Sequence, residues 1–88
     1  VLGVFFDTTF TGTGAKIGRL SPNEGAEKAG IPAGSVITAI DGVKIADQIG
    51  AIVKIRSYAP GTTVNVTVLL PTGGSQSFKV TLGTAPSN

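Results

Sequence analysis

The residues of this chain that could do chemistry are few, and the first of them stand at its start, in VLGVFF at residues 1–6. A glycine inside an apolar, strand-like run weakens the strand unless the backbone bends there or another group approaches closely. Gly3 therefore suggests that backbone N–H groups, rather than side chains, are the functional groups of this segment. The alternative is an ordinary buried strand that carries one glycine.

Catalysis by side chains has little support in the sequence. The 88 residues contain no His and no Cys, which excludes a Ser-His-Asp triad, an imidazole base, a thiolate nucleophile and His or Cys metal ligands. A Ser–Lys dyad of Ser57 and Lys54 is the one alternative, and no pattern around it desolvates the lysine or orients the serine. Glu24 and Glu27 suit the start of a short helix better than a catalytic pair. We expect no catalytic residue, no metal and no cofactor in this segment.

The composition is that of one small domain with little charge. Hydrophobic residues make up 41% of the chain and charged residues 14%, and a domain of this size buries roughly 60–65% of the surface that its unfolded chain exposes. The net charge of +2 comes from scattered cations, without a basic run or interleaved aromatic residues, so nucleic-acid binding is not expected. The apolar runs are only a few residues long, far shorter than a membrane span, and we expect no membrane contact by this domain.

Alternating apolar residues and turn residues predict short strands joined by tight connections. A short helix is expected within 21–34 and a longer one over 47–58, with Asp47 as its N-cap. The expected strands cover residues 2–7, 15–20, 35–40 with a continuation at 43–45, 62–70 and 75–82. This order favours an α+β, mainly β fold: a partly open β-barrel or sandwich of five to six strands capped by two helices. Residues 84–88 are expected to form a flexible tail.

The stretch GAEKAGIPAGSVITAIDGVKI at residues 25–45 resembles the middle of a bacterial PDZ domain, and the segment from APG at 59–61 to VTLG near the end extends the likeness. VLGV at residues 1–4 is similar to the carboxylate-binding loop that begins this domain in HtrA-type (Deg) serine proteases. The resemblance covers residues 1–83 and implies one PDZ domain. Ser35 departs from the family, which usually has Asp there, and we expect this change to alter a loop hydrogen bond.

The resemblance implies that the domain binds C-terminal or extended hydrophobic peptides, which pair with an exposed strand edge by β-augmentation. Consecutive backbone N–H groups in a sharp turn form a nest for an anion. In this chain the N–H groups of Leu2, Gly3 and Val4 would receive the carboxylate of the peptide. The peptide groove would be lined by Phe6, Ile49, Ile52, Ile55 and Arg56.

The side on which each apolar residue lies follows from strand and helix periodicity. Alternation along the first strand places Leu2, Val4 and Phe6 beside the peptide and turns Phe5 toward the interior. On the long helix, Val53 is the expected core residue. Without the resemblance, the simpler interpretation of all these residues is an ordinary core.

The resemblance also implies a larger protein. A trypsin-like serine protease domain would precede this segment, and the PDZ domain would recognise substrates and regulate that protease outside the cytoplasm, in the periplasm or cell envelope. The full-length protein could carry a membrane anchor. The isolated domain is expected to be a monomer, and the parent protein a trimer assembled through its protease domains. The alternative function is that of a scaffold or secretion-apparatus PDZ domain that docks one fixed partner and regulates no protease.

Overall fold

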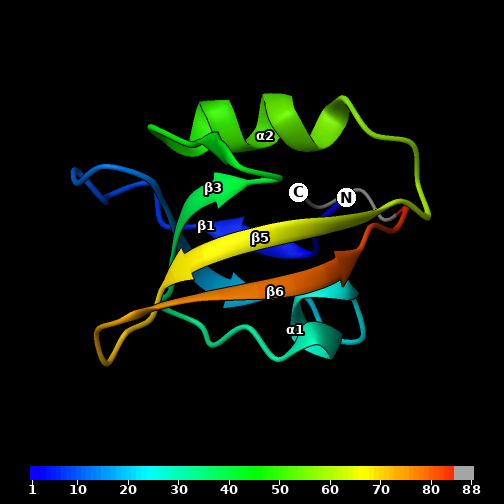
Figure 1. Ribbon diagram of the computed structural model, residues 1–88. Coiled ribbons are helices and arrows are strands. Elements are labelled where there is room, and N and C mark those ends of the chain that lie inside the picture. Colours follow the sequence, from blue (N-terminus) through cyan, green and yellow to red (C-terminus); the bar gives the residue numbers. More distant parts are fainter. Residues whose placement is uncertain (85–88) are drawn as a thin grey trace.

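The computed structural model describes residues 1–84, in which six strands form one antiparallel sheet flanked by two helices (Figure 1). The helices are α1 (Gly25–Ala29) and α2 (Gln48–Arg56). The strands are β1 (Val4–Phe6), β2 (Ala15–Leu20), β3 (Val36–Ile40), β4 (Val43–Lys44), β5 (Thr63–Leu69) and β6 (Ser75–Thr81). This architecture confirms the expected mainly β fold with two helices. Residues 85–88, most of the expected tail, lie outside the described part of the chain.

The sheet order determines which strands have a free edge. The strands follow one another as β1-β2-β3-β5-β6, while β4 pairs with β3 beside this path. β1 and β6 are therefore the two ends of the sheet, and each pairs on one side only. β1 is shorter than the strand expected over 2–7, because Gly3 has a φ of 87° and interrupts the extended backbone.

The core is built by the alternation that the sequence shows most clearly. Val64, Val66 and Val68 point to one face of β5 and are buried, whereas their neighbours along the strand are exposed or half-buried. Both helices and the loop before β1 contribute to the same core. Its fully or nearly fully buried members are Leu2, Val4, Ala15, Ile17, Ala26, Ile31, Ile37, Ile40, Ile45, Ala51, Ile55, Val64, Val66, Val68, Val80 and Leu82.

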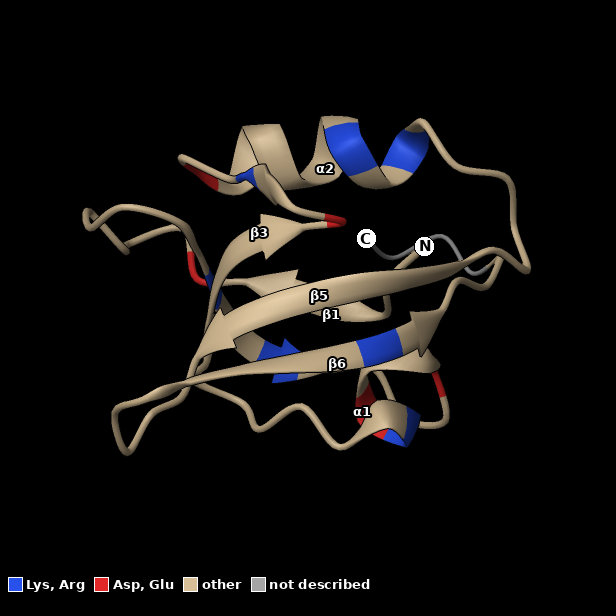
Figure 2. Ribbon diagram, in the orientation of Figure 1, with Lys and Arg blue, Asp and Glu red and all other residues tan. Residues whose placement is uncertain are grey.

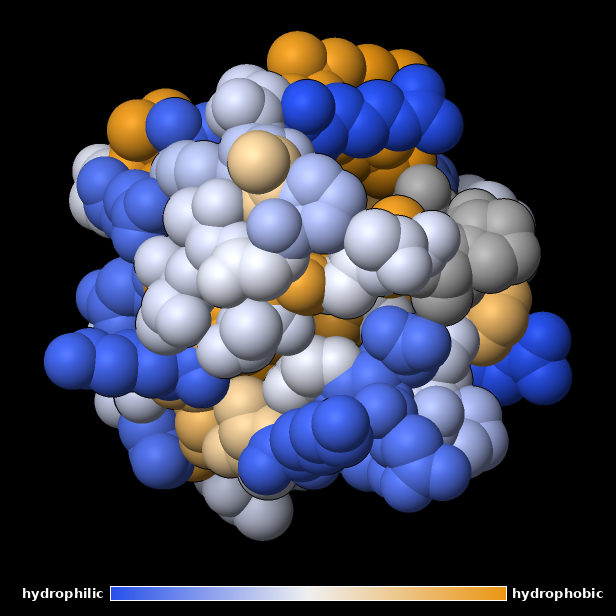
Figure 3. All heavy atoms as spheres, turned by 90° about the vertical axis from the view of Figure 1, so that its right-hand side faces the viewer, coloured by the Kyte–Doolittle hydropathy of each residue, from blue (hydrophilic) through white to orange (hydrophobic). Residues whose placement is uncertain are grey.

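The helix α2 packs on this core through a different face from the one we expected. Asp47 caps it as predicted, with its side chain accepting a hydrogen bond of 2.8 Å from the N–H of Gly50. The residues that it buries are Ala51 and Ile55, while Val53 is 64% exposed. The assignment of Val53 to the core is therefore wrong. In the view of Figure 3, apolar side chains are visible at the top of the molecule, over α2, with a hydrophilic side chain lying across them.

The short helix α1 covers one end of β6. Gly30 ends the helix in a left-handed conformation with a φ of 89°. Gly25 begins it in close contact with the sheet, since a Cβ atom at this position would lie 2.2 Å from the carbonyl oxygen of Thr81. The absence of a side chain at Gly25 thus allows the helix to approach the strand.

Figure 2 shows Lys and Arg positions spread over both helices and several strands, with Asp and Glu positions among them. Among residues 1–84, no group of three or more Asp, Glu, His or Cys residues is placed to hold a metal ion. Neither α1 nor α2 is long and apolar enough to span a bilayer, and these are the helices of the part of the chain that the structure describes.

Candidate functional site

β1 exposes backbone hydrogen-bonding groups along its free edge. The Gly3 carbonyl accepts a hydrogen bond of 2.9 Å from the residue that follows β2, and the N–H of Asp7 donates one of 2.9 Å to a β2 carbonyl. The register shift of this pair lies in β2, where one extra residue stands opposite β1, so the alternation along β1 is kept. In an antiparallel pair the backbone groups of every second residue point toward the partner strand, so the N–H and C=O groups of Gly3, Phe5 and Asp7 point toward β2. The N–H and C=O groups of Val4 and Phe6 therefore face away from the sheet.

The loop before β1 is held by its carbonyl groups. The carbonyls of Val1 and Leu2 accept hydrogen bonds of 2.9 and 3.0 Å from the N–H groups of Gly83 and Ala26. Within residues 1–84, the N–H groups of Leu2 and Gly3 donate to no backbone carbonyl. Together with the N–H of Val4 on the free edge, they are three successive donors available at the start of β1.

Gly3 is required by the fold as well as by any ligand. Its φ of 87° belongs to the left-handed region that favours glycine, and a Cβ atom built on it would lie 2.3 Å from the Cβ of Glu24. Glu24 precedes α1 as its N-cap residue. The bend that leaves the N–H groups of the loop available thus depends on close packing against the start of α1.

The side chains of β1 confirm part of the expected alternation and correct the rest. Leu2 and Val4 are fully buried in the core, and Phe6 packs against it while remaining half-buried. Phe5, which we expected in the interior, is 39% exposed, so that prediction is wrong. Its ring lies on the outer face of the sheet beneath the guanidinium of Arg19, 4.3 Å from the ring centroid. Val4 and Phe6 take the inner face, and alternation leaves Phe5 on the other.

Two hydrogen bonds define how α2 runs relative to β1. Before the helix, the carbonyl of Ala46 accepts a hydrogen bond of 2.8 Å from the N–H of Gly14, which precedes the first residue of β2. Because β2 is antiparallel to β1, the start of β2 lies beside the end of β1, so α2 begins near the end of β1. After the helix, the N–H of Gly61 donates a bond of 2.8 Å to Leu82, whose neighbour Gly83 binds the loop before β1. α2 therefore runs in the direction opposite to β1, and the start of the chain lies on the side where α2 ends (Figure 1).

The predicted helix residues lie in different surroundings. Ile55 joins Leu2 and Val4 in the core, and Ile52 is half-buried. Ile49 is 69% exposed and Arg56 is exposed as well, so neither side chain joins the core to which Leu2 and Val4 belong.

Gln48 is a half-buried residue on the Ile52 side of α2 that the sequence analysis did not name. The two residues are four positions apart and share one side of the helix. This spacing, counted back from Ile52 to the first residue of the helix, is the signal that could have identified Gln48.

The hydroxyl and amine of the conceivable Ser–Lys dyad have other partners. The hydroxyl of Ser57 donates a hydrogen bond of 2.5 Å to the carbonyl of Lys54, as is common at a helix end. The ammonium of Lys54 lies over the ring of Tyr58, 5.0 Å from its centroid. Neither arrangement activates the serine.

Two aspartates near the ends of strands are engaged in structural hydrogen bonds. The hydroxyl of Tyr58 donates to Asp41 at 2.5 Å and the N–H of Asn65 donates to it at 2.7 Å, and these bonds hold the pKa of Asp41 below its ordinary value. The hydroxyl and N–H of Thr9 lower the pKa of Asp7 in the same way. Asp41 thus stabilises the turn after β3.

Ser35 occupies a fully buried position in the loop before β3. Its N–H donates a hydrogen bond of 3.2 Å to the carbonyl of Pro32, and its own carbonyl accepts one of 2.8 Å from Ile17. Its hydroxyl has no hydrogen-bond partner among the described residues. Ser35 thus joins this loop to its neighbours through backbone hydrogen bonds and not through its hydroxyl.

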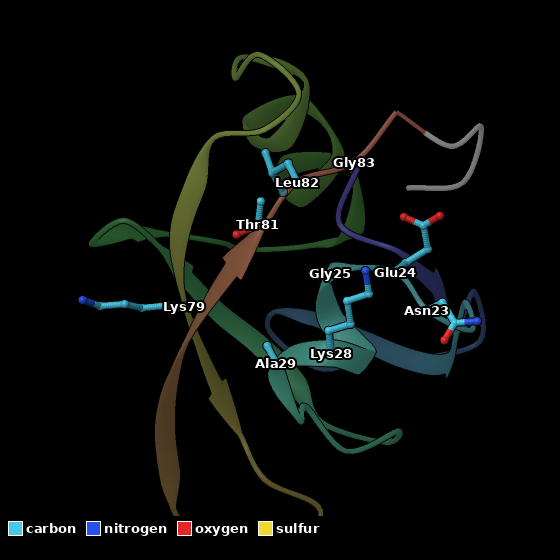
Figure 4. A pocket seen from close by; sticks show the side chains of 9 residues that line it. All are labelled: Asn23, Glu24, Gly25, Lys28, Ala29, Lys79, Thr81, Leu82 and Gly83. Carbon is cyan, nitrogen blue, oxygen red and sulfur yellow. The ribbon is translucent and has the colours of Figure 1, made fainter.

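A shallow pocket of about 320 Å³ lies between α1 and the end of β6 (Figure 4). It contains none of the residues predicted to bind a peptide. Figure 4 shows Lys79 pointing away from Lys28 and Glu24, so these charges do not converge on one point. The pocket is lined by Asn23, Glu24, Gly25, Lys28, Ala29, Lys79, Thr81, Leu82 and Gly83.

Comparison with known proteins agrees with this geometry. Residues 1–82 match the PDZ domain family. The chain is 42% identical over 72 residues, 82% of its length, to serine protease PepD of Mycobacterium tuberculosis. It is 37% identical over 62 residues, 70% of its length, to a probable periplasmic serine endoprotease, DegP-like, of Rhizobium meliloti. It spans only 16% and 12% of the lengths of these two relatives.

A solved structure shows the same fold. The HtrA-type protease AlgW, determined with a decapeptide, superposes with a TM-score of 0.85 at 19% identity, covering 100% of this chain and 30% of AlgW. The resemblance to HtrA- and Deg-type serine proteases is thus confirmed by the relatives in sequence, and the PDZ fold by the structural likeness. The chain belongs to the PDZ domain family.

Proposed function

We propose that this domain binds the C-terminal end of a peptide as an additional strand on the free edge of β1. The observation that carries the proposal is the combination of that free edge with the three available N–H groups of Leu2, Gly3 and Val4 at its start. A peptide running antiparallel to β1 would pair with the outward N–H and C=O groups of Val4 and Phe6. Its terminal carboxylate would then reach the loop at Gly3.

The energetics favour a terminal carboxylate over an internal peptide segment. A hydrogen bond from an N–H group to a charged acceptor contributes about 1.5–3 kcal/mol, roughly twice the contribution of a neutral pair. The last side chain of the peptide would lie between β1 and α2, against Ile52 and the partly buried ring of Phe6. An affinity near micromolar, about −8 kcal/mol, is reasonable for so short an added strand.

The decisive experiment compares peptides with an apolar last residue as free acids and as C-terminal amides. We expect amidation to weaken binding about tenfold or more, measured by isothermal titration calorimetry, because it removes the charge that the loop N–H groups receive. Equal binding of the two forms would show that the loop does not bind a carboxylate and would overturn the proposal.

We further propose that the full-length protein is an extracytoplasmic serine protease regulated through this domain. Support comes from the two protease relatives, one of them described as periplasmic, and from AlgW, whose structure was determined with a decapeptide. Peptide binding can shift a protease between inactive and active states only if the two states bind the peptide with different affinities. We expect the full-length protein to cleave a protein substrate faster with the free-acid peptide than with its amide. A full-length protein without protease activity would favour the alternative, a scaffold domain that docks a fixed partner.

A further inference from the structure

The outer face of β1 defines a second recognition position, and this inference rests on the proposed function. If the last residue of the peptide donates its N–H to the Val4 carbonyl, the residue two positions earlier pairs with Phe6. The penultimate residue then stands directly opposite Phe5, in a pair whose Cα atoms lie about 4.5 Å apart. Side chains of directly opposed residues point to the same face of a sheet. The penultimate side chain would therefore emerge beside Phe5, away from α2.

The charged group on that face is the guanidinium of Arg19. Arg19 is exposed, and its guanidinium lies over the Phe5 ring, 4.3 Å from the centroid. Arg19 forms no ion pair with any carboxylate of residues 1–84. Stacking uses the flat face of a guanidinium and leaves its N–H groups, which lie at the edge, able to bind a carboxylate in a bidentate manner.

The other charges on this face do not neutralise Arg19. Asp7 accepts hydrogen bonds from the hydroxyl and N–H of Thr9, at 2.6 and 2.9 Å, and lies toward the other end of β1. Lys16, which faces Asp7 across the strand pair, has its ammonium over the ring of Phe10, 5.9 Å from its centroid. Beside the position opposite Phe5 thus lies one cation, Arg19, which stacks on the Phe5 ring and forms no ion pair with any described residue.

We propose that Arg19, stacked on Phe5, selects an acidic residue at the penultimate position of the bound peptide. Arg19 is a specificity-determining residue in this role, distinct from the backbone groups that receive the terminal carboxylate. The ligand is therefore a C-terminal peptide with an apolar last residue preceded by Asp or Glu.

The test uses three free-acid peptides that differ only in a penultimate Glu, Gln or Lys, titrated by fluorescence anisotropy. We expect the Glu peptide to bind about threefold to fivefold more tightly than the Gln peptide, and the Lys peptide to bind most weakly, because a solvent-exposed ion pair contributes about 0.2–1 kcal/mol. Arg19→Glu should reverse the order, and Arg19→Gln should abolish the preference without reversing it. Raising the salt concentration should reduce the preference of the unmodified domain.

Lys79→Glu is the matched control, because it makes the same change in net charge on β6, at the opposite end of the sheet. It should leave the order of the three peptides as it is. Equal binding of the three peptides to the unmodified domain, or an equal response to Lys79→Glu and Arg19→Glu, would overturn the role of Arg19 while leaving peptide binding intact. Failure of all three free acids to bind would overturn the proposed function itself, and this inference with it.

Discussion

β1 and β6 are the two end strands of the order β1-β2-β3-β5-β6 in residues 1–84, and the longer of them is not the candidate site. β6 has seven residues where β1 has three. The hydrogen bonds at the two ends of the β5–β6 pair, from Leu70 to Gly74 and from Leu82 to Thr62, both 2.9 Å, fix the alternation along β6. The residues whose backbone groups face its free edge are Ser75, Ser77, Lys79 and Thr81.

The two edges differ in what surrounds them. The end of β6 is covered by α1, because Gly25 packs directly on the Thr81 carbonyl, and Lys79 places a charge on the remaining edge. Charged side chains and covering elements are common protections of edge strands against unwanted pairing. β1 has a bend with free N–H groups at its start, and α2 runs antiparallel to it. The comparison suggests that these two features, rather than the length of an edge, define a peptide site.

The largest effect is expected from Gly3→Ala, which tests the bend before β1. A non-glycine residue at positive φ costs about 1–2 kcal/mol, and the overpacking against Glu24 adds a similar amount. We therefore expect the free energy of unfolding, measured by urea denaturation, to fall by about 2–4 kcal/mol.

The control for Gly3→Ala is Gly73→Ala in the β5–β6 turn. Gly73 has a φ of 91°, and a Cβ atom at this position would meet no other atom within 4 Å, so only the backbone cost applies there. Equal losses for the two variants would show that contact with Glu24 does not constrain the bend. Because Gly3→Ala alters folding, its effect on peptide binding is not a clean test of the carboxylate site.

The sequence predicted the fold well and the orientation of single side chains less well. Alternation in β5 and the turn residues fixed the order of the elements, since these signals are local. The position of Phe5 was missed because two phenylalanines in succession do not show which one faces the core. Val53 was expected in the core, whereas the helix buries Ala51 and leaves Val53 64% exposed. Such choices depend on packing between elements distant in the sequence.

The next largest effect is expected from N-methylation of the peptide backbone, which tests whether the β1 edge pairs with it. On β1, the last residue and the residue two positions before it would point their N–H groups toward the strand, and the penultimate residue would point its N–H away. We expect N-methylation of the third-last residue to weaken binding at least tenfold, because it removes a hydrogen bond and introduces a clash. Methylation of the penultimate residue should have a much smaller effect.

The same peptides can distinguish the two edges of the sheet. Ser77→Pro removes an N–H group that faces the free edge of β6, and we expect peptide affinity to be unchanged by it. A loss of affinity in Ser77→Pro, or equal sensitivity to methylation at successive peptide positions, would indicate pairing on β6 or no strand pairing at all. Calorimetric titration of each peptide provides both measurements.

The smallest effect on peptide affinity is expected from substitutions on α2, the helix that runs antiparallel to β1. Ile52 is half-buried and lies outside the core cluster, so its apolar surface is available to the last side chain of a peptide. Ile52→Ala should weaken binding about fivefold, since each buried CH₂ group contributes about 0.8 kcal/mol and the contact is partial.

Ile49, 69% exposed on the outer side of the same helix, is the matched control. Ile49→Ala should leave affinity unchanged and slightly favour the helix, because Ala has the higher helix propensity. If both substitutions weaken binding equally, the peptide does not lie between β1 and the Ile52 side of α2, and the advantage of β1 over β6 must come from the loop at Gly3 alone.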